Sequence, residues 1–289
     1  MITYSLNISG VSISLETDRD LPVTKDFEPF LDDSVKPRYR AVFHCVESLP
    51  PIPEEVVAEE FCSRTLPDGK GGFVRSFFNP PRDLEPYSLI TYDYANGIID
   101  VPYLERGSVC VSGMANSFYH IGLEGILIRE NRLSFHAACV DTPLGGVLFA
   151  GPSGIGKSTQ AGLWCRYGGG MLINGDRPIL SVDAGKVLAW GSPYAGSSKC
   201  YVNDNCQVAA IVMLKQAPKC CIRKLRGPEA VRRMIVGLNM HTYDRYFVSR
   251  ACDLAMAIAT GVPVYEFACT PDKAAVTFLE KALREGMNP

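Results

Sequence analysis

The stretch GGVLFAGPSGIGKSTQAGLW, Gly145 to Trp164, decides what kind of fold this chain forms. Its middle part, Gly151 to Ser158, matches the pattern G-x-x-x-x-G-K-[ST] in full. The apolar run before the glycines is typical of a strand, and the residues from Gly156 to Tyr167 are typical of a helix. A strand, glycine loop and helix in this order form a P-loop (Walker A motif), whose backbone amides hold nucleotide phosphates. We therefore predict a nucleotide-binding site in this stretch.

Two side chains of the loop have expected roles. Lys157 is expected to reach the β- and γ-phosphates, and the Ser158 hydroxyl to coordinate Mg²⁺. A P-loop enzyme also needs a carboxylate for the metal. The candidate is Asp176, at the end of the predicted strand MLIN, about twenty residues after the lysine. The alternative is an ordinary glycine-rich turn, which the flanking strand and helix patterns disfavour.

The chain is expected to form two domains, residues 1–113 and 114–289. The first contains short alternating strands separated by turn residues, and we predict a small antiparallel β module. A helix over residues 114–131 is predicted to follow it. The second domain mixes strands with helices, and PILSVDAGKVLAW, Pro178 to Trp190, is typical of a hairpin. We therefore predict an α/β domain with a mixed sheet.

Composition excludes several classes of partner. The net charge is −2 and 47% of the residues are hydrophobic, which argues against a surface that binds nucleic acid. The sequence has neither a membrane-length apolar run nor a signal-peptide pattern, so we expect a cytoplasmic protein without membrane contact. The 11 cysteines include no CxxC pair, and we expect free thiols rather than a zinc site. Oligomerisation is left open.

Residues Phe135 to Leu180, FHAACVDTPLGGVLFAGPSGIGKSTQAGLWCRYGGGMLINGDRPIL, resemble the catalytic core of the HPr serine kinase/phosphorylases. That family shares a P-loop fold with the phosphoenolpyruvate carboxykinases and with small kinases of modified-peptide gene clusters. Its pattern is a His on a strand, a hairpin, the glycine loop with its helix, and a pair of Asp residues. The resemblance continues more weakly through GSPYAGSSK, Gly191 to Lys199, and reaches residues 1–113 only by analogy of position. It implies a phosphoenolpyruvate carboxykinase-like P-loop core.

The resemblance also implies ATP and Mg²⁺ as cofactors and assigns residues to them. His136 would lie beside the acidic pair, and Asp176 matches the second Asp of that pair. The implied catalytic residues are Asp176, His136 and Lys157, and the implied metal ligands are Ser158 and Asp176. The implied ATP-binding residues are Gly151, Pro152, Ser153, Gly154, Ile155, Gly156, Lys157, Ser158 and Thr159.

The sequence departs from the family pattern at the first Asp, where it has Gly175. In the family one carboxylate accepts the proton of the substrate hydroxyl while its neighbour holds the metal. The departure argues against HPr itself as the acceptor and against the phosphorylase reaction. His136 is the candidate helper for Asp176, because an imidazole can take a proton at neutral pH. A buried structural histidine is an equally favoured interpretation.

Three functions are consistent with these residues. The first is an ATP-dependent kinase that phosphorylates a Ser or Thr hydroxyl of a peptide or small protein, with the N-terminal module as the docking surface. The second is a nucleotide-binding regulator with little phosphotransfer, which Gly175 favours. The third is a small-molecule hydroxyl kinase. The segment Gly191 to Lys199 is rich in small residues, so Ser192, Tyr194 and Ser197 are candidates to line the acceptor site, although a plain turn explains them equally well.

Overall fold

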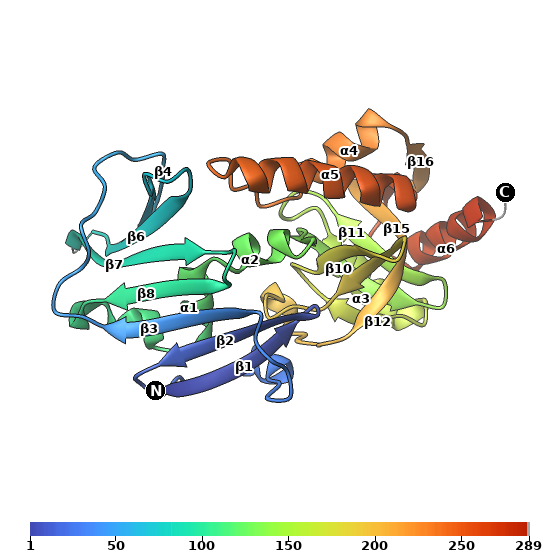
Figure 1. The fold of residues 1–289 in the computed structure, drawn as a ribbon. Helices are drawn as coiled ribbons and strands as arrows, with labels where there is room; N and C mark the ends of the chain where they lie inside the picture. Colours follow the sequence, from blue (N-terminus) through green and yellow to red (C-terminus); the bar gives the residue numbers. More distant parts are fainter. Residues whose placement is uncertain (82, 288–289) are drawn as a thin grey trace. The chain divides into compact units, whose positions relative to one another are not determined.

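The computed structural model describes residues 1–81 and 83–287. The chain forms two compact units. The first comprises Met1–Glu130 together with His241–Val248, and the second comprises Asn131–Met240 together with Ser249–Pro289. The helical segment after residue 113, assigned above to the second domain, therefore belongs to the first unit. Figure 1 shows the elements of both units.

The first unit is built on one eight-stranded sheet with the order β1-β2-β3-β8-β7-β6-β5-β4. The β2–β3 and β3–β8 pairs are parallel and the other pairs are antiparallel. The expected antiparallel module is therefore wrong in this respect, because long connections before and after β3 allow parallel neighbours. The strands are β1 (Ile2–Ile8), β2 (Val11–Thr17), β3 (Tyr39–Cys45), β4 (Ala58–Glu60), β5 (Ser63–Pro67), β6 (Phe73–Asn79), β7 (Asp83–Asp93) and β8 (Ile98–Tyr103).

Two α-helices follow the last strand of the first unit. The predicted helix over residues 114–131 is divided into α1 (Met114–Ile121) and α2 (Leu123–Arg129). Gly122 separates them with a φ of +68°, a left-handed conformation that ends a right-handed helix. The short 3₁₀ helices are η1 (Glu28–Phe30) and η2 (Glu105–Val111).

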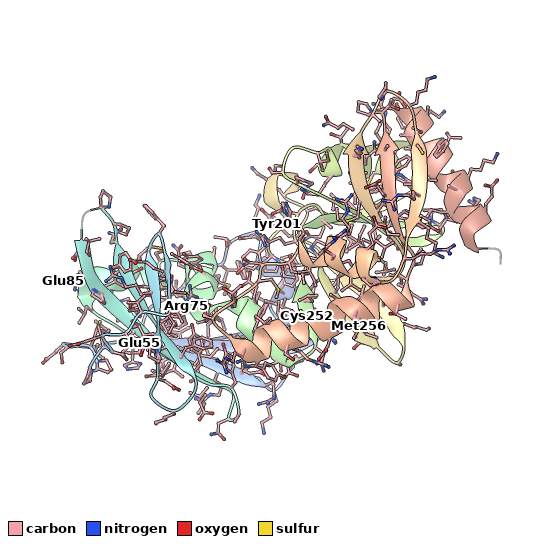
Figure 2. All side chains as sticks on the ribbon, turned by 90° about the horizontal axis from the view of Figure 1, so that it is seen from above. Glu55, Arg75, Glu85, Tyr201, Cys252 and Met256 are labelled. Carbon is pink, nitrogen blue, oxygen red and sulfur yellow. The ribbon has the colours of Figure 1, made fainter. Side chains whose placement is uncertain are left out.

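The first unit also buries polar side chains. Arg75, labelled in Figure 2, donates hydrogen bonds to Glu60 Oε2 and Ser63 Oγ, both at 3.2 Å. His120 Nδ1 lies 2.6 Å from the Asn116 carbonyl oxygen, and its Nε2 lies 2.9 Å from Tyr87 Oη. A carbonyl only accepts, so Nδ1 carries the proton and Nε2 accepts one from the tyrosine.

The second unit has a nine-stranded mixed sheet, which confirms the predicted mixture of strand directions. β10 pairs with β11 and β12 in antiparallel fashion, whereas β15 pairs with both β11 and β17 in parallel fashion. β13 and β14 form the predicted hairpin. The strands are β9 (Arg132–Ser134), β10 (Ala137–Thr142), β11 (Gly145–Ala150), β12 (Met171–Asn174), β13 (Ile179–Asp183), β14 (Lys186–Trp190), β15 (Asn205–Gln216), β16 (Cys221–Leu225) and β17 (Val264–Cys269).

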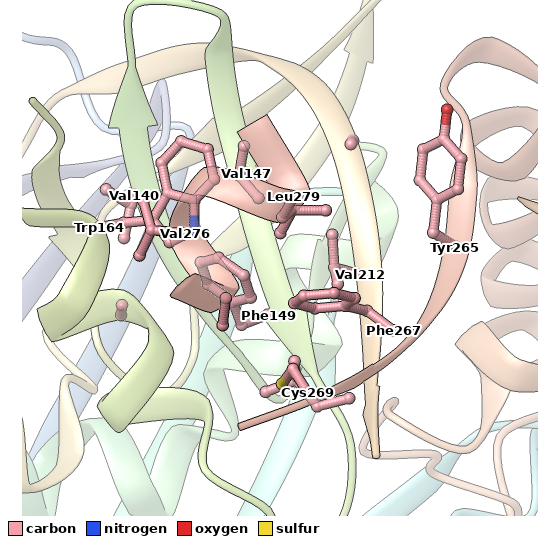
Figure 3. Close-up of a cluster of buried hydrophobic side chains, with 14 of the residues drawn as sticks. Val140, Val147, Phe149, Trp164, Val212, Tyr265, Phe267, Cys269, Val276 and Leu279 are labelled. Atoms are coloured by element: carbon pink, nitrogen blue, oxygen red, sulfur yellow. The ribbon is translucent and has the colours of Figure 1, made fainter. Parts of the chain in front are cut away.

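Two helices cover the central strands of this sheet. Trp164 of α3 (Lys157–Tyr167) and Leu279 of α6 (Lys273–Met287) pack with side chains from β10, β11, β15 and β17, as Figure 3 shows. Removing this apolar surface from water stabilises the unit by about 25 cal/mol per Å². The remaining helices are η3 (Gly196–Ser198), α4 (Pro228–Ile235) and α5 (Arg245–Gly261). No helix within residues 1–81 and 83–287 is long and apolar enough to cross a bilayer.

His120 should make the folded chain sensitive to acid. Burial lowers the pKa of its imidazole from 6.5 to about 4. As pH falls, the unfolded chain therefore binds the proton first. The contribution of His120 to stability is fully present above pH 6.5 and is lost as the pH falls from 6.5 to 4. The pKa difference corresponds to roughly 3 kcal/mol of unfolding free energy. Urea unfolding at pH 7 and 4.5 measures the loss, which His120→Gln should reduce and the control His44→Gln, at a more exposed position, should not. Equal losses in the two variants would contradict this assignment.

Candidate functional site

The glycine loop connects β11 to α3 at the carboxyl end of β11. Three of its glycines have positive φ values, +143° at Gly151, +78° at Gly154 and +110° at Gly156. A side chain at Gly154 or Gly156 would meet no atom within 4 Å, so the backbone conformation, and not crowding, requires glycine there. Helix α3 begins at Lys157, immediately after the last of these glycines.

Lys157 folds back onto the loop that precedes it. Its side chain is buried, and Nζ donates hydrogen bonds to the carbonyl oxygens of Gly151, at 3.0 Å, and Pro152, at 3.2 Å. Burial lowers the Lys157 pKa, while the negative charge of Asp176 acts to raise it. The ammonium group therefore lies inside the loop and within the electrostatic influence of the Asp176 carboxylate.

The other loop residues of the predicted set are accessible. Pro152, Ser153, Ser158 and Thr159 are exposed, and Ile155 is half-buried. Ser158 and Thr159 lie in the first turn of α3, where backbone N–H groups and the helix dipole favour an anion. The loop can thus offer backbone donors, hydroxyl groups and one ammonium group to the same ligand.

Asp176 and His136 meet beside this loop. His136 Nε2 lies 3.3 Å from Asp176 Oδ1, and both side chains are about one-third exposed. The backbone also joins the two segments, because Ala137 N donates to the Asp176 carbonyl at 3.0 Å. His136 was expected on a strand, but it lies between β9 and β10, where its N–H donates to the Gly237 carbonyl at 2.9 Å. Asp176 lies two positions beyond the end of β12.

The environment keeps His136 neutral at neutral pH. Burial lowers its pKa, the positive charges of Lys157 and Arg177 lower it further, and Asp176 opposes them. A neutral imidazole nitrogen can accept a proton from a substrate hydroxyl. The arrangement therefore pairs a carboxylate with an available base.

Strand directions bring these groups to one edge of the sheet. β10 is antiparallel to both β11 and β12, so β11 and β12 run in the same direction. The glycine loop after β11, Asp176 after β12 and His136 before β10 consequently lie at the same edge. Of the predicted residues, Lys157 and Asp176 lie close enough to His136 to influence its pKa, and Asp176 also acts on the pKa of Lys157.

Asn174 is a structural residue of the site that the sequence analysis missed. Its buried Oδ1 accepts hydrogen bonds from the backbone N–H groups of Asp176, at 2.9 Å, and Arg177, at 2.7 Å. Its Nδ2 donates to Ser192 O and Ser192 Oγ, each at 3.2 Å. The Asn-Gly-Asp sequence after a strand is an available signal for this turn, because Asn side chains commonly bond the backbone two residues on. Ser192, a candidate acceptor-site residue, is buried and belongs to this network.

Gly175 lies directly against the turn η3. A Cβ atom at position 175 would collide with the Cβ and Oγ of Ser198 and would lie 3.2 Å from the Ala195 carbonyl oxygen. On the other side of the contact, a Cβ atom at Gly196 would lie 2.8 Å from Asp176 Cβ. The two glycines thus allow the turn to pack on the Asp176 segment, and the turn fills the space that a side chain at position 175 would need. Ser197 is exposed on this turn, and Tyr194 is half-buried before it.

The protein residues near the loop can bind Mg²⁺ only if substrate phosphates and water supply further oxygen ligands. Within residues 1–81 and 83–287, no group of three or more His, Cys, Asp or Glu side chains is arranged to hold a metal ion. The Ser158 hydroxyl, which is exposed, and the Asp176 carboxylate are the two predicted oxygen ligands. Mg²⁺ commonly binds through one or two protein oxygens together with water and substrate phosphates, and this set satisfies that requirement.

Comparison with known proteins gives no sequence match and a structural match with a low TM-score. No protein-family model matches this sequence, and no curated protein sequence matches it. Among solved structures, the chain is similar to the HPr(Ser) kinase/phosphatase from Coxiella burnetii, with 18% sequence identity and a TM-score of 0.34. The match covers 54% of this chain and 99% of that one.

Replacing Asn174 should destabilise the second unit. Asn174→Ala removes the acceptor of two backbone amides and the donor to Ser192, and each unsatisfied buried group costs about 1–3 kcal/mol. We expect a loss of roughly 2–4 kcal/mol in unfolding free energy, measured by urea titration. Asn203→Ala is the matched control, because Asn203 is exposed. Equal stability of the two variants would show that the Asn174 network contributes little.

Proposed function

We propose that this chain binds Mg-ATP on residues 151–159 and transfers the γ-phosphoryl group to a Ser or Thr hydroxyl of a peptide or small protein. The proposal is carried by one observation, the positioning of Lys157 within the electrostatic reach of Asp176 and His136 at the edge where the glycine loop ends. The sequence resemblance to the HPr serine kinases supports the same assignment. On this proposal, the second unit is the phosphoenolpyruvate carboxykinase-like core, and the first unit presents the acceptor.

Each residue then has a distinct role. The loop amides and Lys157 bind the phosphates, and the Lys157 ammonium exchanges its two carbonyl acceptors for phosphate oxygens. Ser158 and Asp176 hold Mg²⁺, which supplies charge neutralisation for the phosphates when bound. Because phosphoryl transfer has a loose transition state, positioning and charge provide most of the rate and a base adds about 10²–10⁴-fold.

Proton transfer completes the proposed reaction. The acceptor oxygen forms a bond to the γ-phosphorus, the bond from that phosphorus to the β,γ-bridging oxygen breaks, and ADP leaves. His136 takes the hydroxyl proton, because its lowered pKa leaves the imidazole unprotonated at neutral pH. The His136–Asp176 contact orients the ring and stabilises the imidazolium that forms.

A nucleotide-binding regulator is the second candidate, and one observation favours it. The turn η3 occupies the space where a side chain at position 175 would lie, so the site is packed around a single carboxylate. A chain adapted to bind ATP without fast turnover has no need for the second carboxylate. In this candidate function the same loop binds ATP, and the bound nucleotide controls an interaction of the protein.

Two substitutions separate binding from turnover. Lys157→Ala should weaken Mg-ATP binding at least about tenfold, which is 1.4 kcal/mol, in a calorimetric titration. Asp176→Asn should retain binding of metal-free ATP and reduce transfer of labelled phosphate to lysate proteins by about 10²-fold or more. Lys186→Ala, at an exposed hairpin position, is the control. Unchanged ATP affinity in Lys157→Ala would rule out the phosphate-loop assignment.

A carboxylate introduced at position 175 distinguishes the kinase from the nucleotide-binding regulator. Gly175→Asp alone should destabilise the fold by its collision with Ser198, whereas the control Gly162→Asp places its side chain in open space. Gly175→Asp combined with Ser198→Gly should fold. If the wild-type chain is a regulator because it has no carboxylate at position 175, this double variant should hydrolyse ATP about 10²-fold faster than Ser198→Gly alone. No increase, together with measurable transfer by the wild type, would favour the kinase.

A further inference from the structure

A groove in the second unit lies between α4 and α5, which Figure 1 labels. Its volume is about 810 Å³, and its lining is largely apolar, with Val231, Ile235, Val236 and Met256. Val236 is 80% exposed, and Met256, labelled in Figure 2, is 55% exposed. Apolar surface that stays open to solvent in this way is typical of a site for another molecule.

The apolar face of α4 is only partly buried. Ala230 and Met234 are buried, whereas their neighbours Val231 and Ile235 are half-buried and line the groove. Val236, directly after the helix, extends this open part of the face. A surface helix of a globular protein normally buries its apolar face. The part of α4 that lines the groove is therefore available to a partner.

Two arginine residues beside the groove carry positive charge that no ion pair neutralises. Arg232 lines the groove, and Arg226 adjoins Gly227, another lining residue. Both arginine side chains are exposed, and neither forms an ion pair with a residue in the described part of the chain. The nearby Arg223, by contrast, is paired with Glu229 at 2.9 Å. The groove therefore favours a ligand that combines apolar side chains with negative charge.

Residues 54–61 of the first unit, which we call the acidic segment, are apolar and carry the opposite charge. The segment contains β4, the last strand at one edge of the eight-stranded sheet. Val56, Val57 and Phe61 are exposed, and Phe61 is 81% exposed. An edge strand with exposed apolar side chains is a template for pairing with another chain. The acidic segment is therefore a second surface suited to an interaction.

The free carboxylates of the acidic segment lie at its start. Glu59 and Glu60 form ion pairs with arginine side chains of β5 and β6, at 3.0 and 3.2 Å. Glu54 and Glu55, the second of which Figure 2 labels, are exposed, and neither has an ion-pair partner among residues 1–81 and 83–287. Two free carboxylates on the segment thus match two free arginine side chains beside the groove.

We propose that the acidic segment of one copy of this chain occupies the α4–α5 groove of a second copy. Its three exposed apolar side chains cover the groove lining, and its two free carboxylates form ion pairs with Arg226 and Arg232. Burial of apolar surface stabilises the contact, and charge complementarity selects the partner. None of these residues belongs to the glycine loop or to the Asp176–His136 pair, so the contact does not depend on the proposed function.

The contact is heterologous, because the two surfaces differ. Each copy uses its acidic segment toward one neighbour and its groove toward another, so copies assemble head-to-tail into a ring or an open chain. A variant that lacks one surface keeps the other. Two such variants can therefore form one contact with each other and none with themselves.

Sedimentation velocity over a series of protein concentrations tests the contact. Wild type should form species larger than a dimer as the concentration rises. Met256→Asp, in the groove, and Phe61→Asp, in the acidic segment, should each weaken self-association at least about tenfold, because each places a charge in an apolar contact. The controls Met171→Asp and Leu84→Asp change side chains that are 56% and 60% exposed elsewhere, and both should associate as wild type does.

Mixing the two disabled variants gives a sharper test. An equimolar mixture of Met256→Asp and Phe61→Asp should form dimers with one copy of each and nothing larger, while each variant alone stays monomeric at the same concentration. Contact between identical surfaces, or contact at some other surface, would not produce this recovery. If either variant does not fold, Arg232→Glu and Glu55→Lys, at exposed positions, repeat the mixture without changing an apolar residue.

Three outcomes would overturn the proposal. A wild type that stays monomeric up to about 0.1 mM would leave the groove to a different protein. Self-association that both variants retain would place the interface elsewhere. Loss of association in only one of the two variants would show that the acidic segment and the groove do not bind each other.

Discussion

The parallel pairing of β11 with β15 and the antiparallel pairing of β11 with β10 determine at which edge of the sheet the groups of the candidate site lie. Only this combination places the carboxyl ends of β11, β12, β15 and β17 at the edge where β10 begins. Loops at the carboxyl ends of parallel strands form the usual ligand crevice of α/β proteins. In this chain the glycine loop, the Asp176 carboxylate and the His136 imidazole lie at that edge, while the buried contacts of α3 and α6 hold the strands in place.

The geometry of Asp176 depends on close backbone packing. Gly175 and Gly196 let two segments approach within the distance that a Cβ atom would block, and the Asn174 amide ties the same turn to Ser192. A carboxylate held in this way loses little entropy when it binds a ligand, because its backbone is already fixed. The same packing leaves no room for a side chain at position 175 unless Ser198 moves.

Elements that depend on residues close together in the sequence were predicted better than contacts between distant segments. The strand β11, helix α3 and the β13–β14 hairpin were predicted because glycines, alternation and helical spacing act within a few residues. The parallel β3 neighbours were missed because they depend on residues far apart in the sequence. The break at Gly122 has a left-handed backbone that spacing does not reveal. Asn174 was missed as an anchor because its partner Ser192 lies in a distant segment.

A single carboxylate creates a conflict that the histidine resolves. If Asp176 coordinates Mg²⁺, its lone pairs are committed to the metal and its basicity falls, so it is a poor acceptor for the substrate proton. Burial and the positive charge of Lys157 lower the pKa of His136, so its imidazole is neutral at neutral pH. On the proposed function, an imidazolium formed on proton transfer would be stabilised by Asp176, whose Oδ1 lies 3.3 Å from Nε2. On the proposed kinase function, Asp176 therefore holds the metal and the neighbouring His136 imidazole accepts the proton, so a second carboxylate is not required.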